Sequence, residues 1–175
     1  MRTFIVSIQG VAPLRMNRFI FGKKQPTKPT DEWLKEDAFD RCYRDDKGFY
    51  IPREAIKKTI INGAAKIRHG KGRAKTEMTA ILFPQDNAYL KKNIKPILSD
   101  LQIVRIPPGP KGARVPKYFA QFPEWEAKFE ILITDDSMPE ETIKDSIVAA
   151  GIYNGLLDGR PDYGRFVMNE FKKNI

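Results

Sequence analysis

The alternation of apolar and polar residues between Trp125 and Thr134 constrains the fold of this chain most. Every second position from Trp125 to Ile133 is apolar, and Glu126, Lys128 and Glu130 stand between them. Successive side chains of a strand point to opposite faces, so the pattern predicts a strand with one face on a core and the other in water. A half-buried strand of this kind is typical of an antiparallel sheet.

Further strands and two helices are expected around it. The β-branched and aromatic residues 3–8 predict a central strand, and residues 165–171 predict a last one. An apolar stripe at helical spacing predicts a helix over 52–69, with Pro52 in its first turn. Ser137 and Glu140 form a capping box, which predicts a helix over 137–150. This order predicts an α+β fold, a ferredoxin-like or RNA-recognition-motif-like antiparallel sheet with helices on one face.

The other segments are interpreted as insertions in one domain, 1–175, which a chain with 41% hydrophobic residues can support. Residues 11–48 form a long insertion after the first strand, with a short helix over 31–37. Residues 101–123 form a projecting hairpin or thumb-like insertion, with a strand over 101–106 and a proline-glycine tip over 107–112. Between them we expect a strand over 78–83 and a short helix over 89–98.

Cysteine and histidine usage excludes several classes of site. Cys42 is the only cysteine and His69 the only histidine. An intrachain disulfide, a zinc site of cysteine and histidine, and a catalytic dyad that needs a second such residue are therefore excluded. No apolar run approaches the roughly 20 residues that span a bilayer, and the N-terminus lacks a signal-peptide pattern. We expect a cytoplasmic protein without a membrane partner, a metal or a cofactor.

Positive charge is in excess, and it is clustered. Lysine and arginine outnumber aspartate and glutamate by 31 to 22, a net charge of +9, which predicts a polyanionic partner. The densest patch lies at the C-terminal end of the first long helix and contains no acidic residue: Lys66, Arg68, Lys71, Arg73 and Lys75. Cations at a helix C-terminus are stabilised by about 0.3–1 kcal/mol each, which accounts for one or two of them. We interpret the whole patch as a phosphate-binding surface.

Two more patches combine basic with aromatic residues. The second spans the hairpin and precedes two aromatic rings, Tyr118 and Phe119; its members are Arg105, Lys111, Arg114 and Lys117. The third follows the first strand, around Phe19 and Phe21, and comprises Arg15, Asn17, Arg18, Lys23 and Lys24. Cations for phosphates and rings for bases suit a single-stranded nucleic acid. An ordinary exposed hairpin with buried rings is the alternative interpretation of the second patch.

The segment 150–166 is rich in glycine, with Gly151, Gly155, Gly159 and Gly164 beside Arg160 and Arg165. Such residues allow close approach of a backbone or a phosphate. The segment does not match a nucleotide-binding loop. The loop and its Gly-Arg-Phe ending resemble the C-terminal signature of the RAMP superfamily, CRISPR-associated proteins built on RNA-recognition-motif-like folds. The ending also resembles that of compact proteins from phage and prophage genomes.

Residues 44–58 resemble a second pattern of that superfamily, an Arg-Asp pair, a turn, Tyr-Ile-Pro and a helix start. Here Arg53, Glu54 and Ala55 replace the small residues with which the family's helix begins. By position, Lys57 and Lys58 match the family's basic residues on this helix, and Gly155, Gly159, Gly164 and Arg165 match its loop. The resemblance implies a subunit that lines up along a guide RNA, beside copies of itself and other subunits of a ribonucleoprotein.

We therefore expect a non-enzymatic protein that binds single-stranded nucleic acid through its phosphates, RNA in the first place. A phage single-stranded DNA-binding or recombination accessory protein is the alternative, because the sequence does not distinguish the two polymers. A RAMP-type ribonuclease would need His69 or the acidic residues between Asp31 and Asp46. Surface and turn positions explain these residues more simply. A scaffold that contacts only proteins is the remaining alternative.

Overall fold

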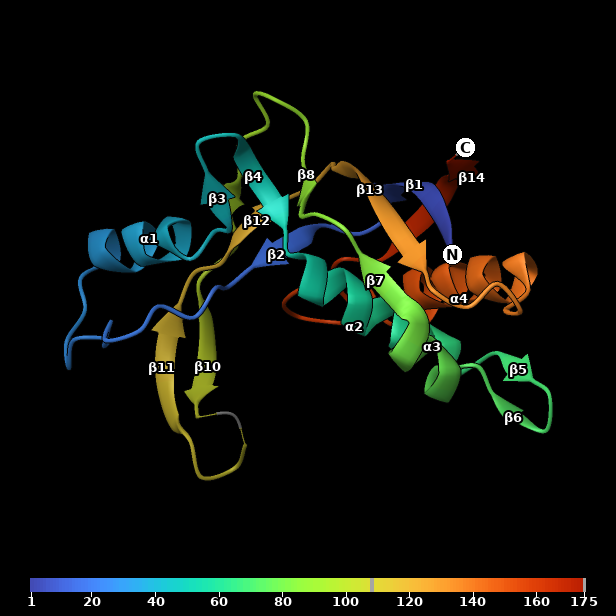
Figure 1. Ribbon diagram of the computed structural model, residues 1–175. Helices are drawn as coiled ribbons and strands as arrows, with labels where there is room; N and C mark the ends of the chain where they lie inside the picture. The colour runs from blue at the N-terminus through green and yellow to red at the C-terminus, as the bar shows by residue number, and fades with distance from the viewer. Residues whose placement is uncertain (108, 175) are drawn as a thin grey trace.

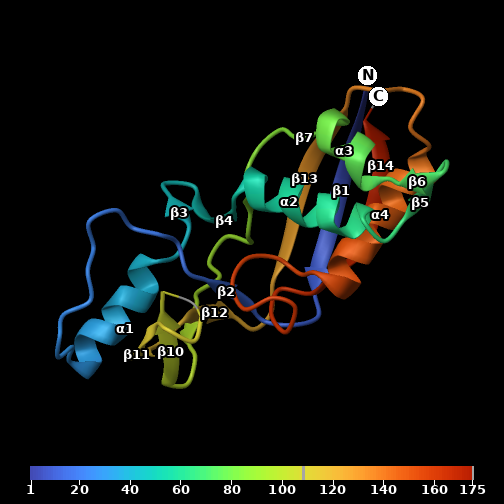
Figure 2. The same cartoon turned by 90° about the horizontal axis from the view of Figure 1, so that it is seen from below.

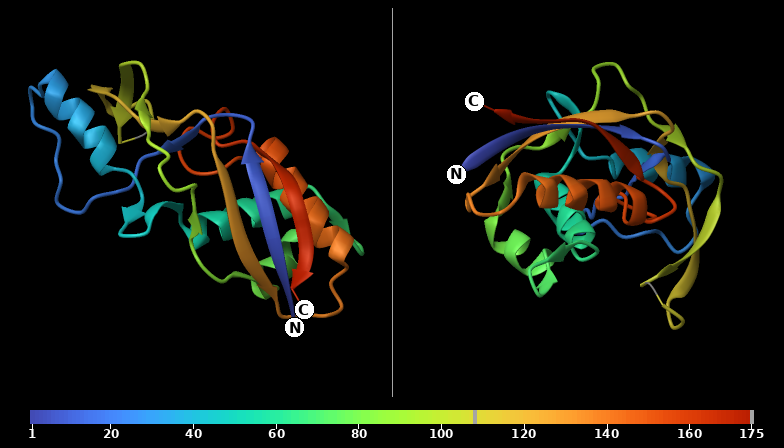
Figure 3. Two further views of the ribbon diagram at one scale, coloured as in Figure 1. Left: turned by 90° about the horizontal axis from the view of Figure 1, so that it is seen from above. Right: turned by 90° about the vertical axis from the view of Figure 1, so that its right-hand side faces the viewer.

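The computed structural model describes residues 1–107 and 109–174, and a four-stranded antiparallel sheet is its centre. The strand order is β14-β1-β13-β7, with β1 Arg2–Gly10, β7 Leu82–Pro84, β13 Glu126–Ile133 and β14 Phe166–Asn174. Helix α2 (Arg53–Ala64) lies between β1 and β7 in the chain, and α4 (Glu140–Tyr153) lies between β13 and β14. Both helices cover the same face of the sheet (Figure 3). The predicted α+β class is confirmed.

The core lies between this sheet and its helices. Strand β1 pairs with β13 so that Phe4 stands opposite Ile131 and Val6 opposite Phe129. All four side chains are buried, as the alternation along β13 predicts. The other face of β13 carries Lys128, which is exposed. Apolar burial on one face only is what an antiparallel sheet with a single helical layer requires.

Helices α2 and α4 pack closely against each other through a glycine. A Cβ atom added at Gly63 would lie 2.2 Å from the carbonyl oxygen of Ser146 and 2.5 Å from the amide nitrogen of Ala150. Ile56 and Ile60 on the same helix are buried, which confirms the predicted apolar stripe. The helix ends at Ala64 and not near residue 69, because the chain turns there into a small hairpin of β5 (Arg68–His69) and β6 (Gly72–Arg73).

Two predictions for the middle of the chain are wrong. Residues 75–81 form helix α3 (Lys75–Ile81), and only Leu82–Pro84 is a strand; Met78 packs its side chain into the core from the helix. The expected helix over 89–98 is absent from this described segment, which contains β8 (Ala88–Tyr89) and β9 (Ile97–Leu98). Pro96 and the left-handed Asn93, with φ of 71°, are unsuited to a helix interior.

The capping box at residues 137–140 is also wrong. Pro139 is the N-cap of α4, and no side chain caps this helix. The Ser137 hydroxyl donates to Asp135 Oδ1 at 2.7 Å, so it closes the turn before the helix. The helix itself is confirmed, because Ile143 and Ile147 are buried on one side.

The two insertions form one end of the molecule (Figures 1 and 2). The first contains β2 (Leu14–Met16), α1 (Asp31–Asp40) and β3 (Arg44–Asp45), and β4 (Gly48–Ile51) begins at its last residue. The second contains β10 (Gln102–Ile106) and β11 (Ala113–Lys117), which pair as the predicted hairpin, and β12 (Ala120–Phe122), which joins β2 and β9 in a small sheet. Pro108, in the predicted tip, lies outside the described residues. Among the described helices, none combines the length and apolarity needed to cross a membrane.

Candidate nucleic-acid interface

A groove crosses the N-terminal end of α2, between the first insertion and the glycine-rich loop. It consists of two cavities, of about 440 and 230 Å³, and Tyr43 lines both. We call this surface the α2 groove. The larger cavity is lined by Arg18, Tyr43, Tyr50, Pro52, Arg53, Glu54, Gln85, Asp86 and Asn87. The smaller cavity is lined by Asn17, Tyr43, Ala55, Lys58, Leu157, Asp158 and Arg160.

Three tyrosines stand in a row that begins in the groove: Tyr43 and Tyr50 line it, and Tyr89 lies beyond them. The ring centroids of Tyr43 and Tyr50 are 6.0 Å apart, and those of Tyr50 and Tyr89 are 5.7 Å apart. The Tyr89 hydroxyl donates to Asp45 Oδ2 at 2.6 Å, and this hydrogen bond raises the pKa of Tyr89 to about 12. Burial raises the pKa of Tyr43 as well. Tyr43 and Tyr50 therefore present aromatic faces in the groove on which bases can stack.

The N-terminus of α2 already has hydrogen-bonding and charged partners within the protein. The amide of Arg53 donates to Asn87 Oδ1 at 3.0 Å. The pKa of Glu54 is lowered chiefly because its carboxylate accepts a hydrogen bond from its own amide, and then because Arg53 donates to it. A carboxylate thus occupies the position at which a helix N-terminus attracts anions. An anion in this groove would therefore be held by side chains more than by helix amides.

The glycine-rich loop closes on itself beside the groove. Gly155, Gly159 and Gly164 have φ values of 71°, 74° and 71°, the left-handed region. A Cβ atom on Gly164 would lie 2.0 Å from the Leu156 carbonyl oxygen. The Thr59 hydroxyl of α2 donates to the Gly155 carbonyl at 3.1 Å and holds the loop against the helix. The loop's own closure thus explains these glycines, and Arg160 is the exposed side chain that the loop brings to the groove.

The third patch separates into supporting and accessible residues. Arg15 is only 4% exposed, and its guanidinium lies 4.5 Å from the Phe119 ring and 3.7 Å from the Tyr163 ring. It joins the hairpin to the glycine-rich loop. Lys23 pairs with Asp37 at 2.9 Å and Asp40 at 2.8 Å. The accessible members are Asn17 and Arg18, which line the groove, and the exposed Lys24.

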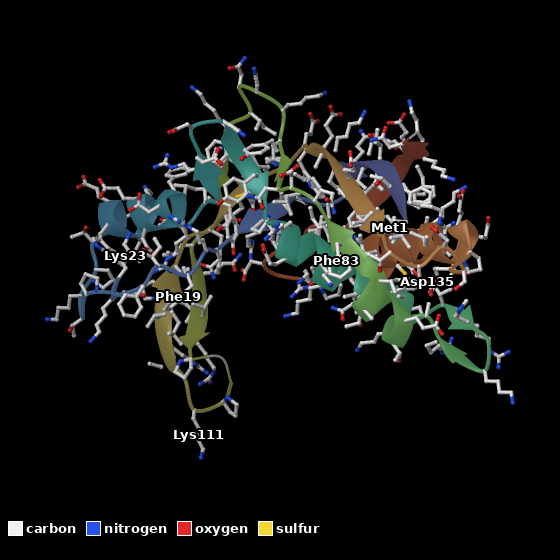
Figure 4. All side chains as sticks on the ribbon, in the orientation of Figure 1. Met1, Phe19, Lys23, Phe83, Lys111 and Asp135 are labelled. Carbon is white, nitrogen blue, oxygen red and sulfur yellow. The ribbon has the colours of Figure 1, made fainter. Side chains whose placement is uncertain are left out.

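The hairpin patch divides in the same way. Arg105 donates to the carbonyl oxygens of Pro110 and Gly112, which closes the tip. Lys117 is 9% exposed, and its ammonium donates to Asn17 Oδ1 at 2.8 Å. Lys111 and Arg114 are exposed, and Lys111 points away from the body at the tip (Figure 4).

All five residues of the first patch are exposed, at the other end of the molecule from the β10–β11 hairpin. Lys66, Arg68, Lys71, Arg73 and Lys75 lie on and beside the β5–β6 hairpin. This hairpin and the β10–β11 hairpin project to the same side of the molecule, with α2 between them (Figures 1 and 3). On α2, Lys57 contacts the Phe83 ring at 4.2 Å and Lys58 lines the groove. Arg165 is exposed at the end of the glycine-rich loop.

Most of the predicted cations are free of acidic partners. Among the basic residues predicted from the sequence, Lys23 alone forms an ion pair within residues 1–107 and 109–174. Sequence reasoning missed the tyrosine row and Asn87. Tyr50 and Tyr89 are brought together by the pairing of β4 with β8. No local sequence pattern predicts this pairing.

The residues required by a nuclease have other partners. His69 Nε2 lies 3.0 Å from Glu77 Oε2, on the β5–β6 hairpin. Asp31 pairs with Lys35, and Asp45 accepts from Tyr89. Across the described part of the chain, no three histidine, cysteine or acidic side chains are grouped so that they could hold a metal ion.

The fold and the groove define an α+β protein with a tyrosine-lined surface, of mixed charge, beside an antiparallel sheet. Neither a protein-family model nor any curated protein matches the sequence. Solved structures do match. A chain of the type III-B Cmr-beta complex bound to cognate target RNA superposes with a TM-score of 0.57 at 15% identity, over 98% of this chain. This chain spans 60% of the length of that neighbour.

The second structure is Cmr6 from Pyrococcus furiosus, with a TM-score of 0.51 and 14% identity, over 95% of this chain and 98% of Cmr6. The chain therefore shares the fold of this Cmr-beta chain and of Cmr6. This likeness confirms, at the level of the fold, the resemblance found in the sequence.

Proposed function

We propose that this protein binds single-stranded RNA through its phosphate backbone, as a RAMP-like, non-catalytic subunit of a CRISPR-type ribonucleoprotein. The observation that carries the proposal is the α2 groove, where Arg18, Lys58 and Arg160 are exposed beside Tyr43 and Tyr50. None of these three cations pairs with an acid in the described part of the chain. Unpaired cations beside aromatic faces are what a strand of phosphates and bases requires.

The position of the groove determines how the domain and its insertions would be arranged around the RNA. The four-stranded sheet with α2 and α4 would be a ferredoxin-like, RNA-recognition-motif-like unit in a single domain of residues 1–175. Residues 11–48 and 101–123 would flank the RNA as palm and thumb. The strand would extend beyond one groove, so that further copies of the chain or other subunits bind along it. The fold shared with a chain of an RNA-bound complex supports this arrangement.

The salt dependence of binding tests the proposal. For single strands, log K falls with log salt by about 0.7 for each phosphate contacted. The affinity for a labelled single-stranded RNA is measured by fluorescence anisotropy at several salt concentrations. The double variant Lys58→Met/Arg160→Met should reduce the slope by about 1.4, the value for two phosphate contacts.

The control removes two exposed cations near the end of β14, Lys172→Met/Lys173→Met, which leaves the groove intact and changes the net charge equally. It should leave the slope nearly unchanged. A salt-independent affinity, or an equal change of slope in both variants, refutes binding in the groove. Competition by a DNA strand of the same sequence, with deoxyuridine in place of thymidine, decides between RNA and the single-stranded DNA alternative, because the two strands then differ only in the 2′-hydroxyl.

A further inference from the structure

Two phenylalanines are almost completely exposed on one turn of the first insertion. Phe19 is 81% exposed and Phe21 is 94% exposed, whereas Ile20 between them is half-buried. Gly22, with φ of 75°, makes the turn, and the amide of Lys23 donates to the Ile20 carbonyl at 3.3 Å. We call residues 19–21 the phenylalanine turn; Figure 4 shows Phe19 between α1 and the β10–β11 hairpin.

The phenylalanine turn is held on both sides. Before it, the Arg18 amide donates to the Arg41 carbonyl at 2.7 Å, and Arg41 donates back to the Arg18 carbonyl at 3.2 Å. After it, Lys23 reaches Asp37 and Asp40 at the end of α1. The Asp37 side chain is 8% exposed, so this ion pair is partly buried. These contacts therefore fix the backbone at a point where two apolar rings are exposed to water. A loop without such contacts could bury the rings instead.

The loop that carries the turn is cationic, whereas the neighbouring helix α1 carries five acidic residues and one lysine. The first thirty residues contain no acidic side chain, and Arg18, Lys24 and Lys28 are exposed around the turn. The loop is also tied to the hairpin, because Gln25 Nε2 donates to the Pro116 carbonyl of β11 at 3.3 Å. A polyanion held by the hairpin and Arg18 would pass beside both rings. Apolar rings on a loop with exposed lysine and arginine side chains favour a ligand that is anionic and carries flat apolar faces.

We infer that Phe19 and Phe21 stack on unpaired bases of the bound strand, as a second stacking site beyond the tyrosines of the α2 groove. This inference rests on the proposed function, since it names the part of the ligand that these rings contact. Stacking on phenylalanine needs no hydrogen-bond readout, so the site accepts every base. In this arrangement Lys23 positions the turn through α1 and does not itself contact phosphate.

The test compares three ligands for wild type and Phe19→Ala/Phe21→Ala. The ligands are a labelled single-stranded oligoribonucleotide of mixed sequence, an abasic strand of the same length, and the RNA as a perfect duplex. The double variant should bind the single strand about 10- to 100-fold more weakly, which is the loss expected for one or two stacked bases. Its affinity for the abasic strand and its salt slope should equal those of wild type.

Two controls keep the result specific. Val148→Ala/Ile152→Ala removes apolar side chains that are 38% and 53% exposed on α4, at the other end of the molecule, and should leave RNA affinity unchanged. Phe19→Trp/Phe21→Trp should retain or increase affinity, because the indole rings also stack. Both phenylalanines are exposed, so the alanine variant should unfold at the wild-type temperature.

The outcomes separate this inference from the proposed function. If wild type binds RNA and Phe19→Ala/Phe21→Ala binds it equally well, the stacking site is refuted while the groove stands. An equal loss for the abasic strand also refutes it, since no base is then involved. If the alanine variant keeps its RNA affinity but no longer retains a protein subunit of the complex, the turn is a protein contact. If wild type binds none of the three ligands, the proposed function itself fails.

Discussion

Replacement of Lys117 by methionine tests how the groove is organised. The Lys117 ammonium is buried, donates to Asn17 Oδ1 at 2.8 Å and lies 5.2 Å from the Phe119 ring. An ammonium can only donate, so it fixes the Asn17 amide with its oxygen inward. The amide nitrogen is then free to donate into the groove, which Asn17 lines. Lys117 is thus a positioning residue, and methionine preserves its length without its charge.

The structure sets the magnitude of two opposing effects on stability. The variant loses a hydrogen bond from a charged group, worth about 1.5–3 kcal/mol, and a cation–π contact, worth about 0.5–1 kcal/mol. It also removes a buried ammonium that no carboxylate pairs with among the described residues, a gain of several kcal/mol. We expect the free energy of unfolding to stay within about 1 kcal/mol of wild type or to rise.

Lys117→Met should weaken RNA binding, but the salt dependence of binding should stay the same as in wild type. An oriented amide donor to a phosphate oxygen contributes about 1.5 kcal/mol, which corresponds to roughly tenfold in affinity. Because Lys117 does not reach a phosphate, anisotropy titrations should give the wild-type salt slope. Lys58→Met is the matched control: it should lose affinity and about 0.7 of slope. Asn17→Ala/Lys117→Met should be no weaker than Asn17→Ala alone. A reduced slope for Lys117→Met, or additive losses in the double variant, refutes the positioning role.

Burial, and then the charge of Arg41, lower the pKa of Lys117, so stability should also depend on pH. Between this lowered pKa and the ordinary value of 10.5, the unfolded chain binds more protons than the folded chain. The stability of wild type should therefore rise relative to Lys117→Met as pH increases through that window. Denaturant unfolding of both proteins measures the difference, and a constant difference contradicts the assignment.

Three further predictions concern the scaffold. Burial raises the pKa of Asp37, but hydrogen bonds from Arg41 and Lys23 outweigh it and leave the pKa lowered. Asp37→Asn should then cost about 1–3 kcal/mol at neutral pH, and denaturant unfolding should show this cost vanish as pH falls through the lowered pKa. Gly63→Ala should destabilise by about 3 kcal/mol or more, whereas Gly72→Ala, which meets no atom within 4 Å, should change stability by less than about 0.5 kcal/mol; thermal unfolding compares them. Burial raises the pKa of Cys42 to about 11, so a thiol reagent at pH 8 should label it only in denaturant, and rapid labelling of the native protein would contradict its burial.

The sheet and its helices could be predicted because their patterns are local. The alternation along β13 and the stripe of Ile56 and Ile60 each reflect one buried face, and a buried face repeats with the period of its element. The region 75–98 could not be predicted in this way. Its strands are two or three residues long, so they carry no period, and their pairing with β4, β12 and β13 comes from tertiary contacts.

The same difference between local patterns and tertiary contacts decides which residues of the candidate site could be predicted. Composition and clustering identified the exposed cations of the β5–β6 hairpin, because clusters without acids remain charged wherever the chain places them. The same reasoning could not tell the buried Arg15 and Lys117 from the accessible Arg18 and Arg160, since charge patterning does not report burial. The tyrosine row was missed because Tyr50 and Tyr89 meet only through the pairing of β4 with β8.

Photo-crosslinking measures most directly whether RNA lies in the α2 groove. A single-stranded RNA that carries 4-thiouridine at successive positions is irradiated with the intact protein, and the crosslinked residues are identified by mass spectrometry. We predict crosslinks at Tyr43 or Tyr50 and in the loop around Arg160. Efficient crosslinking confined to the outer face of the sheet, with none in the groove, would contradict the account.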